Sequence, residues 1–293
     1  MKDLNAFLNV RESLLNFLRE DIGTGDITSN SIVDPQAYAR AEIVCKTNET
    51  IVVCGLEEAS IIFEMCNCKT KTFLRDGSLI KKGSIVMEVI GKALSIMKAE
   101  RTALNLIMRM SGIATETRKL TASIHTSYSS VKIASTRKTA PGLRFFDKKA
   151  VAMGGGETHR MRLDDMVLIK DNHIPLVGSV VEAIKRARKK IGSSIKIECE
   201  ATNLEEAISA VYAGADRVML DNFSPIEVAR TIGELSRRGI RDKAKIEVSG
   251  GIMLQNVESY AKAKPDIISI GYLTHSPKAI DFSLEIVDNQ ILD

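Results

Sequence analysis

The stretch IKIECEATNLEEAISAVYAGADRVMLDN, from Ile195 to Asn222, holds two short apolar runs separated by a segment with helical spacing. That segment begins at Asn203 and stops at Gly214, which is how capped helices begin and end. Short runs rich in Ile and Val suit strands that are buried on both faces, and parallel strands need a helical crossover to connect them. The stretch therefore predicts a strand, a helix and a second, parallel strand.

The same pattern recurs from residue 130 onward. Further apolar runs that end in polar or glycine residues are VKIASTRK (131–138), MVLIKDNH (166–173), KIEVSGG (245–251) and IISIGYLTH (267–275). Further helical segments cover residues 179–192, 224–239 and 253–263. Repeated β-α units of this kind indicate an α/β fold with a parallel sheet, in which the loops after the strands converge on one mouth.

Residues before 130 follow a different pattern. A helical segment precedes short strand-like pieces, among them ARAEIVCK and SIVMEVIGKA, and a longer helix follows them. This pattern predicts a separate mixed α/β domain of roughly a hundred residues. We therefore expect an N-terminal domain over residues 1–110, a β/α domain over residues 111–275, and a C-terminal helix over residues 276–293 that packs back on the N-terminal domain.

The overall composition argues against several classes of protein. The 293 residues carry a formal net charge of +4, which lacks the basic excess of a protein that binds nucleic acid or a charged membrane surface. No apolar run in the sequence approaches the length that a membrane helix needs. The five cysteines are odd in number and scattered, so we interpret them as thiols of a cytoplasmic protein rather than as metal ligands or disulfides.

Two cationic segments have a simple interpretation as solvent-exposed helix faces. Arg144, Lys148 and Lys149 continue past a predicted strand end onto a helical stretch, and the run Lys185–Lys190 lies on another predicted helix. The role of His173 stays open between substrate binding and orientation of its loop.

The predicted strands of the repeated units end in residues that suit a charged ligand. These residues are Arg137 and Lys138, Lys170 to His173, Glu198 and Glu200, Asp221 and Asn222, Ser249 to Gly251, and Gly271 and His275. Glu200 and Asp221 offer the hard oxygen ligands that Mg²⁺ takes beside an anionic substrate. Glycines after the last two strands suit a barrel phosphate site, although a glycine pair is also an ordinary turn. We expect Glu198 to point to the face opposite Glu200, away from the site.

Eight blocks of sequence occur in one order along the chain. They are ERTALN at residues 100–105, TRKTAPGLR at 136–144, GGGETHRMRLDD at 154–165, LIKDNHI at 168–174, ECEATNLEEA at 198–207, LDNFSP at 220–225, VSGGI at 248–252 and GYLTHS at 271–276. Together with EDIGTGDIT at residues 20–28, these blocks resemble the quinolinate phosphoribosyltransferase family over nearly the whole chain. Ala140 and Arg162 depart from that family's pattern without removing a charged contact.

The resemblance implies a fold, a reaction and an assembly. The fold would be an N-terminal α/β sandwich domain followed by an incomplete, seven-stranded β/α barrel. The reaction would form nicotinate mononucleotide, carbon dioxide and pyrophosphate from quinolinate and phosphoribosyl pyrophosphate, with Mg²⁺, in cytoplasmic NAD biosynthesis. The assembly would be a homodimer with shared active sites at the subunit junction, and whether dimers assemble further stays open.

The resemblance also assigns the residues that would bind quinolinate. Arg137, His159, Arg160 and Lys170 would hold its carboxylates, and Arg101 of ERTALN would reach in from the partner subunit. Cationic side chains suit this task because quinolinate carries two adjacent carboxylates, which Arg forks and Lys point charges both bind.

The phosphoribosyl side of the site follows from the resemblance in the same way. Lys138 would lie between the two substrates and act in catalysis with Glu200 and Asp221, which would face the ribose and hold the metal directly or through water. The phosphate would be bound by Ser249, Gly250, Gly251, Gly271 and His275. Carboxylates near the anomeric carbon suit displacement there because the transition state has oxocarbenium character.

Three other interpretations stay open. A molybdenum-transport-associated relative of the same fold would share TRKT and PG but is expected to lack the LIKDNH and ERTALN blocks, which this chain has. A Schiff-base aldolase would use Lys170 as its nucleophile. A non-catalytic protein that binds phosphoribosyl ligands would use the same pocket, although binding alone would not need both Glu200 and Asp221.

Overall fold

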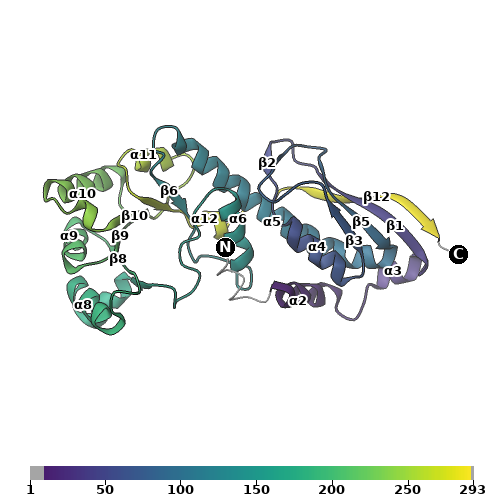
Figure 1. Cartoon of the computed structure of the whole chain (residues 1–293), viewed down its shortest axis with the longest axis horizontal. Helices are drawn as coiled ribbons and strands as arrows, with labels where there is room; N and C mark the ends of the chain where they lie inside the picture. The colour runs from purple at the N-terminus through teal and green to yellow at the C-terminus, as the bar shows by residue number, and fades with distance from the viewer. Residues whose placement is uncertain (1–9, 292–293) are drawn as a thin grey trace. The chain divides into compact units, whose positions relative to one another are not determined.

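The structure is a computed structural model that describes residues 10–291 of the chain. The chain divides into two compact units, whose elements are labelled in Figure 1. The first unit comprises Met1–Glu116, Ala140–Gly154 and Ser276–Asp293, and the second comprises Thr117–Thr139 and Gly155–His275. This division differs from the contiguous limits that we expected, because the segment that follows the first barrel strand belongs to the first unit.

The first unit is built on a four-stranded antiparallel sheet. Its strands are β1 (Ala37–Cys45), β3 (Lys69–Thr72), β5 (Ile85–Lys92) and β12 (Phe282–Ile291), in the order β12-β1-β5-β3 (Figure 1). A separate short ribbon consists of β2 (Ile51–Val52) and β4 (Leu79–Ile80). Buried and part-exposed residues alternate along most of β1, so one face of the sheet contributes to the core.

Helices complete the core of the first unit. They are α2 (Val10–Ile22), α3 (Ile27–Ile32), α4 (Leu56–Met65), α6 (Arg144–Met153) and the first part of α5 (Ala93–His125). Leu14 of α2, Phe63 of α4 and Met110 of α5 are fully buried in the same apolar cluster as the inner face of β1. This cluster is the core on which the first unit depends.

The C-terminal segment forms a strand, so the prediction of a helix over residues 276–293 was wrong. β12 runs antiparallel to β1 along the whole of that strand. Phe282 and Leu284 pack against the core of the first unit and alternate with polar residues, a period of two that favours a strand. Pairing also satisfies the backbone groups on one edge of β1. Residues 292–293 of the predicted helix lie outside the described residues.

The helix α6 overturns the interpretation of its lysines as a solvent-exposed face. Lys148 is fully buried, and the side chain of Lys149 is 14% exposed. The Nζ of Lys149 lies 2.7 Å from Glu58 and 2.8 Å from Glu57, and 3.3 Å from Asp76. Burial alone would lower the pKa of Lys149, but these carboxylates raise it. The lysine is tolerated there because acidic groups from α4 and from the loop before β4 compensate its charge.

The second unit contains a six-stranded parallel sheet. Its strands are β6 (Lys132–Ala134), β7 (Val167–Ile169), β8 (Ile197–Ala201), β9 (Arg217–Asp221), β10 (Lys245–Ser249) and β11 (Ile267–Ser269), in the order β6-β11-β10-β9-β8-β7. On the other edge of β6, Glu157 forms an isolated parallel bridge with Ala134. The barrel is therefore incomplete, and this single bridge occupies the position of a seventh strand.

Helical segments connect the parallel strands. They are η1 (Asp171–His173), α7 (Ile174–Val177), α8 (Val180–Ile191), α9 (Leu204–Ala213), α10 (Pro225–Arg237), η2 (Arg241–Lys243), α11 (Val257–Ala261) and α12 (Tyr272–His275). The side chains of Ser179, Asn203 and Ser224 each accept a hydrogen bond from the backbone N–H three residues on, which confirms the predicted caps. Among residues 10–291, no helix combines the length and the apolar character that crossing a bilayer demands.

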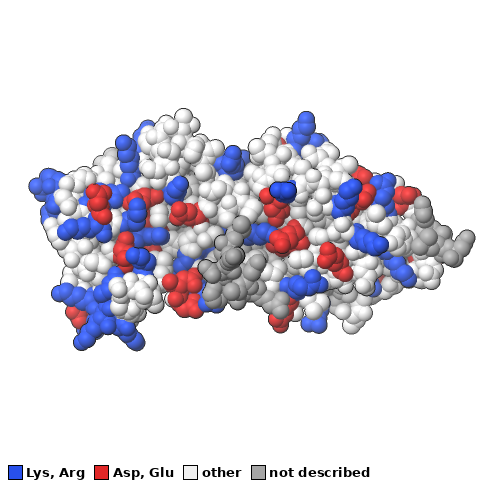
Figure 2. Space-filling model, in the orientation of Figure 1, with Lys and Arg blue, Asp and Glu red and all other residues white. Residues whose placement is uncertain are grey.

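The cationic face of α8 is exposed, as the sequence predicted. Lys185, Arg186, Lys189 and Lys190 are exposed, and Figure 2 shows Lys and Arg side chains gathered over this helix. The opposite side of α8 buries Val180 and Ile184 in the core of the second unit. The helix is therefore amphipathic, with its charges in solvent.

Candidate active site at the carboxyl ends of the parallel strands

The carboxyl ends of the parallel strands carry most of the predicted site residues. Asp221 lies opposite Ser249 in the register of β9 and β10, and the amide of Asn222 donates to the carbonyl of Ser249 at 2.8 Å. The residues at or just beyond these strand ends are Arg137, Lys138, Lys170, Glu200, Asp221, Ser249, Gly250, Gly251, Gly271 and His275. The loops of an incomplete barrel thus present cations, carboxylates and glycines at one edge of the sheet.

Two carboxylates at this edge influence each other. The Nζ of Lys170 lies 3.8 Å from Oε1 of Glu200, whose side chain is 13% exposed. Burial raises the pKa of Glu200, and the charge of Asp221 raises it further, against the opposing effect of Lys170. Burial also raises the pKa of Asp221, while Lys138 and Lys170 lower it. Both carboxylates are therefore poorly stabilised as anions and would gain from a cation.

Glycines at two strand ends allow other groups to approach the backbone. A Cβ on Gly271 would lie 3.1 Å from Cδ of Lys138 and 3.3 Å from Cδ2 of His275. A Cβ on Gly250, where φ is +107°, would collide with Asn222. The hydroxyl of Thr274 donates to the carbonyl of Lys138 at 2.9 Å, which holds the loop after β6 beside α12. Backbone groups left open in this way are suited to binding a phosphate.

Two arginines lie close enough for their charges to interact. Arg160 is 7% exposed, and its Nη1 donates to the carbonyl of Met166 at 3.3 Å. Burial lowers the pKa of Arg160, and the charge of Arg137 lowers it further. The Nε atom of Arg137 is a buried donor without a hydrogen-bond partner in the part of the chain that the structure describes. This pair of guanidinium groups suits a ligand that brings negative charge.

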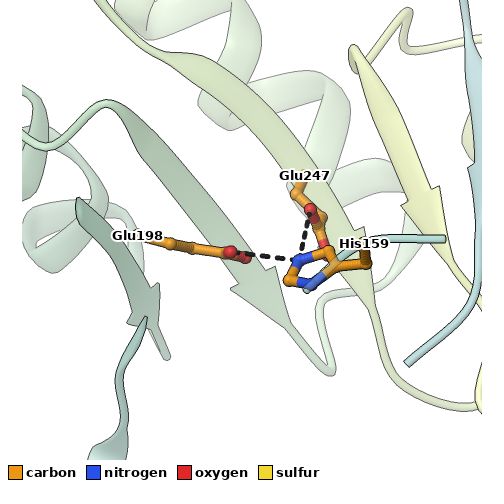
Figure 3. A group of neighbouring side chains, drawn as sticks. All are labelled: His159, Glu198 and Glu247. Atoms are coloured by element: carbon orange, nitrogen blue, oxygen red, sulfur yellow. Dashed lines mark ion pairs between the residues drawn. The ribbon is translucent and has the colours of Figure 1, made fainter. Parts of the chain in front are cut away.

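His159 lies in a buried group of charged side chains rather than among open strand-end groups (Figure 3). Its Nε2 lies 3.0 Å from Oε2 of Glu198 and 3.5 Å from Oε2 of Glu247. Both carboxylates are fully buried, and the side chain of His159 is 6% exposed. On the other side of the ring, the backbone N–H of Arg160 donates to Nδ1 at 2.7 Å.

The buried group contains opposing charges. Burial alone would lower the pKa of His159, but the neighbouring carboxylates of Glu198 and Glu247 raise it to about 9. The amide proton that faces Nδ1 favours the neutral ring, and in either form the proton on Nε2 lies between the two carboxylates. Nη1 of Arg217 lies 2.8 Å from Glu247 and 3.8 Å from Glu198, and the hydroxyl of Ser269 donates to Glu247.

The expectation that Glu198 points away from the site was wrong. Side chains two residues apart on a strand share a face, so Glu198 and Glu200 both point into the barrel. Figure 3 shows Glu198 extending from β8 and Glu247 from β10 toward His159. Glu198 stands two residues before Glu200, and Glu247 stands two residues before Ser249. This spacing is the sequence signal that could have identified the pair.

Arg101 differs from the other predicted site residues because it belongs to the first unit. It lies on α5 with its side chain 58% exposed, and its Nη2 is 4.0 Å from Oε1 of Glu100. The guanidinium of Arg101 is therefore largely available to solvent or to another molecule.

Comparison with known proteins relates this geometry to one family. The model of the quinolinate phosphoribosyl transferase N-terminal domain matches residues 26–111, and the model of its C-terminal domain matches residues 113–285. A probable carboxylating nicotinate-nucleotide pyrophosphorylase from Methanothermobacter thermautotrophicus is 42% identical over 269 residues, which are 92% of this chain and 96% of that protein. A protein of the same name from Bacillus subtilis is 40% identical over 95% of this chain and 94% of its own length.

A solved structure agrees with these sequence matches. The nicotinate-nucleotide pyrophosphorylase from Ehrlichia chaffeensis superimposes with a TM-score of 0.88 at 36% identity, covering 96% of this chain and 99% of that one. The resemblance seen in the sequence blocks is thereby confirmed over both parts of the chain. The chain belongs to the quinolinate phosphoribosyltransferase family.

Proposed function

We propose that this protein transfers the phosphoribosyl group of phosphoribosyl pyrophosphate to quinolinate and removes one carboxylate, giving nicotinate mononucleotide, pyrophosphate and carbon dioxide for NAD biosynthesis. The observation that carries the proposal is the juxtaposition of cations with a repelling carboxylate pair, Glu200 and Asp221, at the carboxyl ends of the parallel strands. Membership of the family supports the same reaction.

Cationic groups at this edge suit quinolinate. Its two adjacent carboxylates need at least two positive partners, and Arg137 and Arg160 supply a pair of guanidinium groups whose charges interact. The unpartnered Nε of Arg137 is a donor that a substrate carboxylate would satisfy. Lys170 adds a point charge beside Glu200. His159 was expected to join this set, but its ring has partners inside the protein.

Glu200 and Asp221 suit Mg²⁺. Each has a pKa raised first of all by burial, so a dication beside them would stabilise both anions. Hard carboxylate oxygens together with substrate oxygens are ligands that Mg²⁺ commonly takes, either directly or through water. The metal would neutralise the charge that develops on the pyrophosphate leaving group.

The residues of the chain then have distinct tasks. Lys138, packed over Gly271, would hold negative charge between the two substrates. The carboxylates of Glu200 and Asp221 would stabilise the oxocarbenium character that develops at the anomeric carbon during displacement. Once the ring nitrogen of quinolinate is ribosylated and cationic, the ring can hold the electrons that decarboxylation leaves behind. The chain therefore needs to orient the ring and exclude water rather than supply a nucleophile.

Backbone groups would receive the ribose phosphate. The SGG segment follows β10, and Gly271 follows β11 next to His275. The close approach permitted at Gly250 and Gly271 suits an anion bound by N–H groups. Ser249 and His275 would add side-chain donors at the same place.

A Schiff-base aldolase fits this site less well. A lysine nucleophile is activated by desolvation or by a neighbouring cation. The side chain of Lys170 is 47% exposed and has a carboxylate neighbour, Glu200, at 3.8 Å. Lys170 is therefore better suited to binding an anion than to forming an imine.

A cytoplasmic homodimer with shared sites completes the proposal, with exposed Arg101 of one subunit reaching the site of the other. The test mixes two inactive variants, Arg101→Ala and Lys138→Ala, after unfolding and refolding them together. By two-fold symmetry about half of the dimers are mixed and each holds one intact site, so roughly a quarter of the activity returns. Activity that stays at the level of the separate variants, with subunit exchange confirmed, would remove Arg101 from a shared site.

The reaction itself is tested by the release of carbon dioxide from quinolinate labelled at its 2-carboxylate. We expect release only when phosphoribosyl pyrophosphate and Mg²⁺ are both present, because decarboxylation follows ribosylation of the ring nitrogen. Nicotinate, which lacks the 2-carboxylate, serves as the control, and the quantity compared for the two substrates is the formation of nicotinate mononucleotide. Release without the sugar donor would contradict the mechanism.

A further inference from the structure

Both ring nitrogens of His159 are engaged inside the protein. Nε2 faces Glu198 at 3.0 Å and Glu247 at 3.5 Å, and Nδ1 accepts the amide proton of Arg160 at 2.7 Å. The side chain is 6% exposed (Figure 3). A substrate carboxylate at Nε2 would be repelled by Glu198 and Glu247, and Nδ1 already accepts the amide proton, in contrast to the contact that the family resemblance implies.

The backbone at His159 needs support. Its φ of +51° lies in the left-handed region, which residues other than glycine adopt with strain. The ring is held on one side by the two carboxylates and on the other by the amide of Arg160. Arg160 is the next residue in the chain, so the conformation of this turn sets the direction in which its side chain leaves the backbone, and its Nη1 then donates to the carbonyl of Met166.

A second layer of contacts holds Glu247, whereas the carboxylate oxygens of Glu198 have no hydrogen-bond partner among the described residues and lie 3.8 Å from Arg217 at the nearest. Arg217 lies 2.8 Å from Glu247, and the hydroxyl of Ser269 donates to the other oxygen of Glu247. Replacing a buried ion-pair network by apolar residues is often neutral or stabilising, so fold stability alone is a weak reason for this one. A better reason for the network is that it fixes the position of the His159 ring. The positive charge of Arg217 beside these carboxylates also disfavours a metal ion among them.

We propose that His159 is a positioning residue, whose ring is clamped by Glu198 and Glu247 so that the turn aims Arg160 at a carboxylate of quinolinate. The inference rests on the proposed function, in which Arg160 binds quinolinate. It separates two neighbouring residues that the resemblance treats alike: Arg160 contacts the substrate, and His159 acts through Arg160.

The test is a mutant cycle read by steady-state kinetics. It compares His159→Ala, the double variant Glu198→Gln with Glu247→Gln, and the triple variant that combines them. We expect the KM for quinolinate to rise about tenfold in His159→Ala and by a similar factor in the double variant, with the triple variant no worse than His159→Ala. The KM for phosphoribosyl pyrophosphate and kcat should change little, because the clamp acts through a quinolinate contact.

Two outcomes would overturn the inference. A double variant with an unchanged KM for quinolinate would show that His159 does not act through the carboxylates. Effects that multiply in the triple variant would show that the ring and the carboxylates act independently. Glu182→Gln is the matched control, since it makes the same Glu-to-Gln change in the same unit, on α8, where Glu182 pairs with Arg186, and its KM for quinolinate should match that of the unsubstituted protein.

A conservative variant keeps the inference testable if His159→Ala fails to fold, as judged by thermal unfolding. The amide of His159→Gln can donate to Glu198, so its KM for quinolinate should be closer to that of the unsubstituted protein than the KM of Glu198→Gln with Glu247→Gln. A larger loss in His159→Gln would contradict the clamp. If the unsubstituted protein forms no nicotinate mononucleotide, the proposed function is overturned together with the inference. If the unsubstituted protein is active but the variants do not show the expected KM values, only the inference is overturned.

Discussion

At the amino end of the parallel sheet, Asp216 accepts hydrogen bonds from Arg188 at 2.6 Å, from Lys196 at 2.9 Å and from the amide of Ile197 at 2.9 Å. At the carboxyl end of the neighbouring strand β8, Glu200 lies 3.8 Å from Lys170 and close enough to Asp221 to be repelled by it. At the amino end of the sheet, a carboxylate thus accepts several hydrogen bonds. At the carboxyl end, two carboxylates repel each other.

The paired arrangement at the amino end occurs twice. Asp266 accepts hydrogen bonds from Arg241 at 2.8 Å, from Lys245 at 2.9 Å and from the amide of Ile246 at 2.8 Å. A cleft of about 860 Å³ is lined in part by Asp216 and Asp266 at this end, and His159 and Arg160 also line it. Its size alone would suggest a binding site, but most of its charges already have partners. A cleft becomes a strong candidate for a catalytic site when the charged side chains that line it lack partners of opposite charge.

The pKa shifts at the two ends have opposite directions. Burial raises the pKa of both Glu200 and Asp221. Burial would also raise the pKa of Asp216, but the amide of Ile197 and its two cationic partners bring it down to about 2. The lowered value marks a carboxylate that stabilises the fold, and the raised values mark carboxylates whose charge must be stabilised by something else.

The largest expected effect is on activity at the carboxyl end. Glu200→Gln keeps the shape of the side chain and removes its charge, so kcat should fall by about 100-fold or more, as when one electrostatic stabiliser of a transition state is lost. The free energy of unfolding should not decrease, because a partly desolvated charge is removed. Initial rates of nicotinate mononucleotide formation and urea unfolding measure the two quantities.

A matched control for this variant is Glu182→Gln, which makes the same change at a half-exposed carboxylate of α8, paired with Arg186. Its rate should equal that of the unsubstituted protein. If Glu200→Gln were as active as this control, the contrast between the ends of the sheet would have no bearing on catalysis.

The next effect is on stability at the amino end. Asp216→Ala removes the acceptor of three charge-assisted hydrogen bonds and should lower the free energy of unfolding by about 2 kcal/mol, with kcat unchanged. Asp266→Ala should behave in the same way, because its partners match those of Asp216. Urea unfolding and initial rates would check both variants. If either variant folded but lost much of its kcat, the conclusion that the amino end of the sheet serves stability and the carboxyl end serves catalysis would be wrong.

A smaller effect follows when pH replaces mutation. The pKa of Asp216 is lowered to about 2 from an ordinary 3.8. Its stabilising contribution is therefore fully present above pH 4 and is lost as pH falls from about 4 to about 2. In Asp216→Asn that part of the loss should be absent, so the difference in unfolding free energy between the two proteins should narrow over this window. A constant difference across the window would show that charge is not what Asp216 contributes.

The smallest effects are expected from the lysines of the two amino-end pairings. Lys196 and Lys245 are 68% and 67% exposed, so Lys196→Met and Lys245→Met should each change the free energy of unfolding by no more than about 0.5 kcal/mol. Paired thermal or urea unfolding would measure this. A loss equal to that of Asp216→Ala would mean that the exposed lysines, rather than the arginines and backbone amides, carry the stabilisation.

Local pattern was sufficient for much of the fold and of the candidate site. Helices starting after Ser179, Asn203 and Ser224 follow from short-range capping, which depends on neighbours three residues apart. The strand-end positions of Glu200 and Asp221 follow from the order of apolar runs, because parallel strands bring their carboxyl ends to one edge.

Other features depended on partners that are distant in the sequence. Lys149 is mostly removed from solvent because Glu58, 91 residues away, is folded against it, and an exposed helix face would look the same in the sequence. The last segment is a strand because the edge of β1, more than two hundred residues earlier, offers it a hydrogen-bonding partner.

The sequence by itself thus determined the repeated β-α units, their caps and the charged residues that follow each strand, since all of these depend on spacing along a few residues. Only the tertiary structure decided which charges meet. His159, Glu198 and Glu247 come from three segments, and their encounter separates His159 from its neighbour Arg160. The physical reason is that burial and charge compensation, which set the state of each ionisable group, are properties of packed neighbours rather than of the chain around a residue.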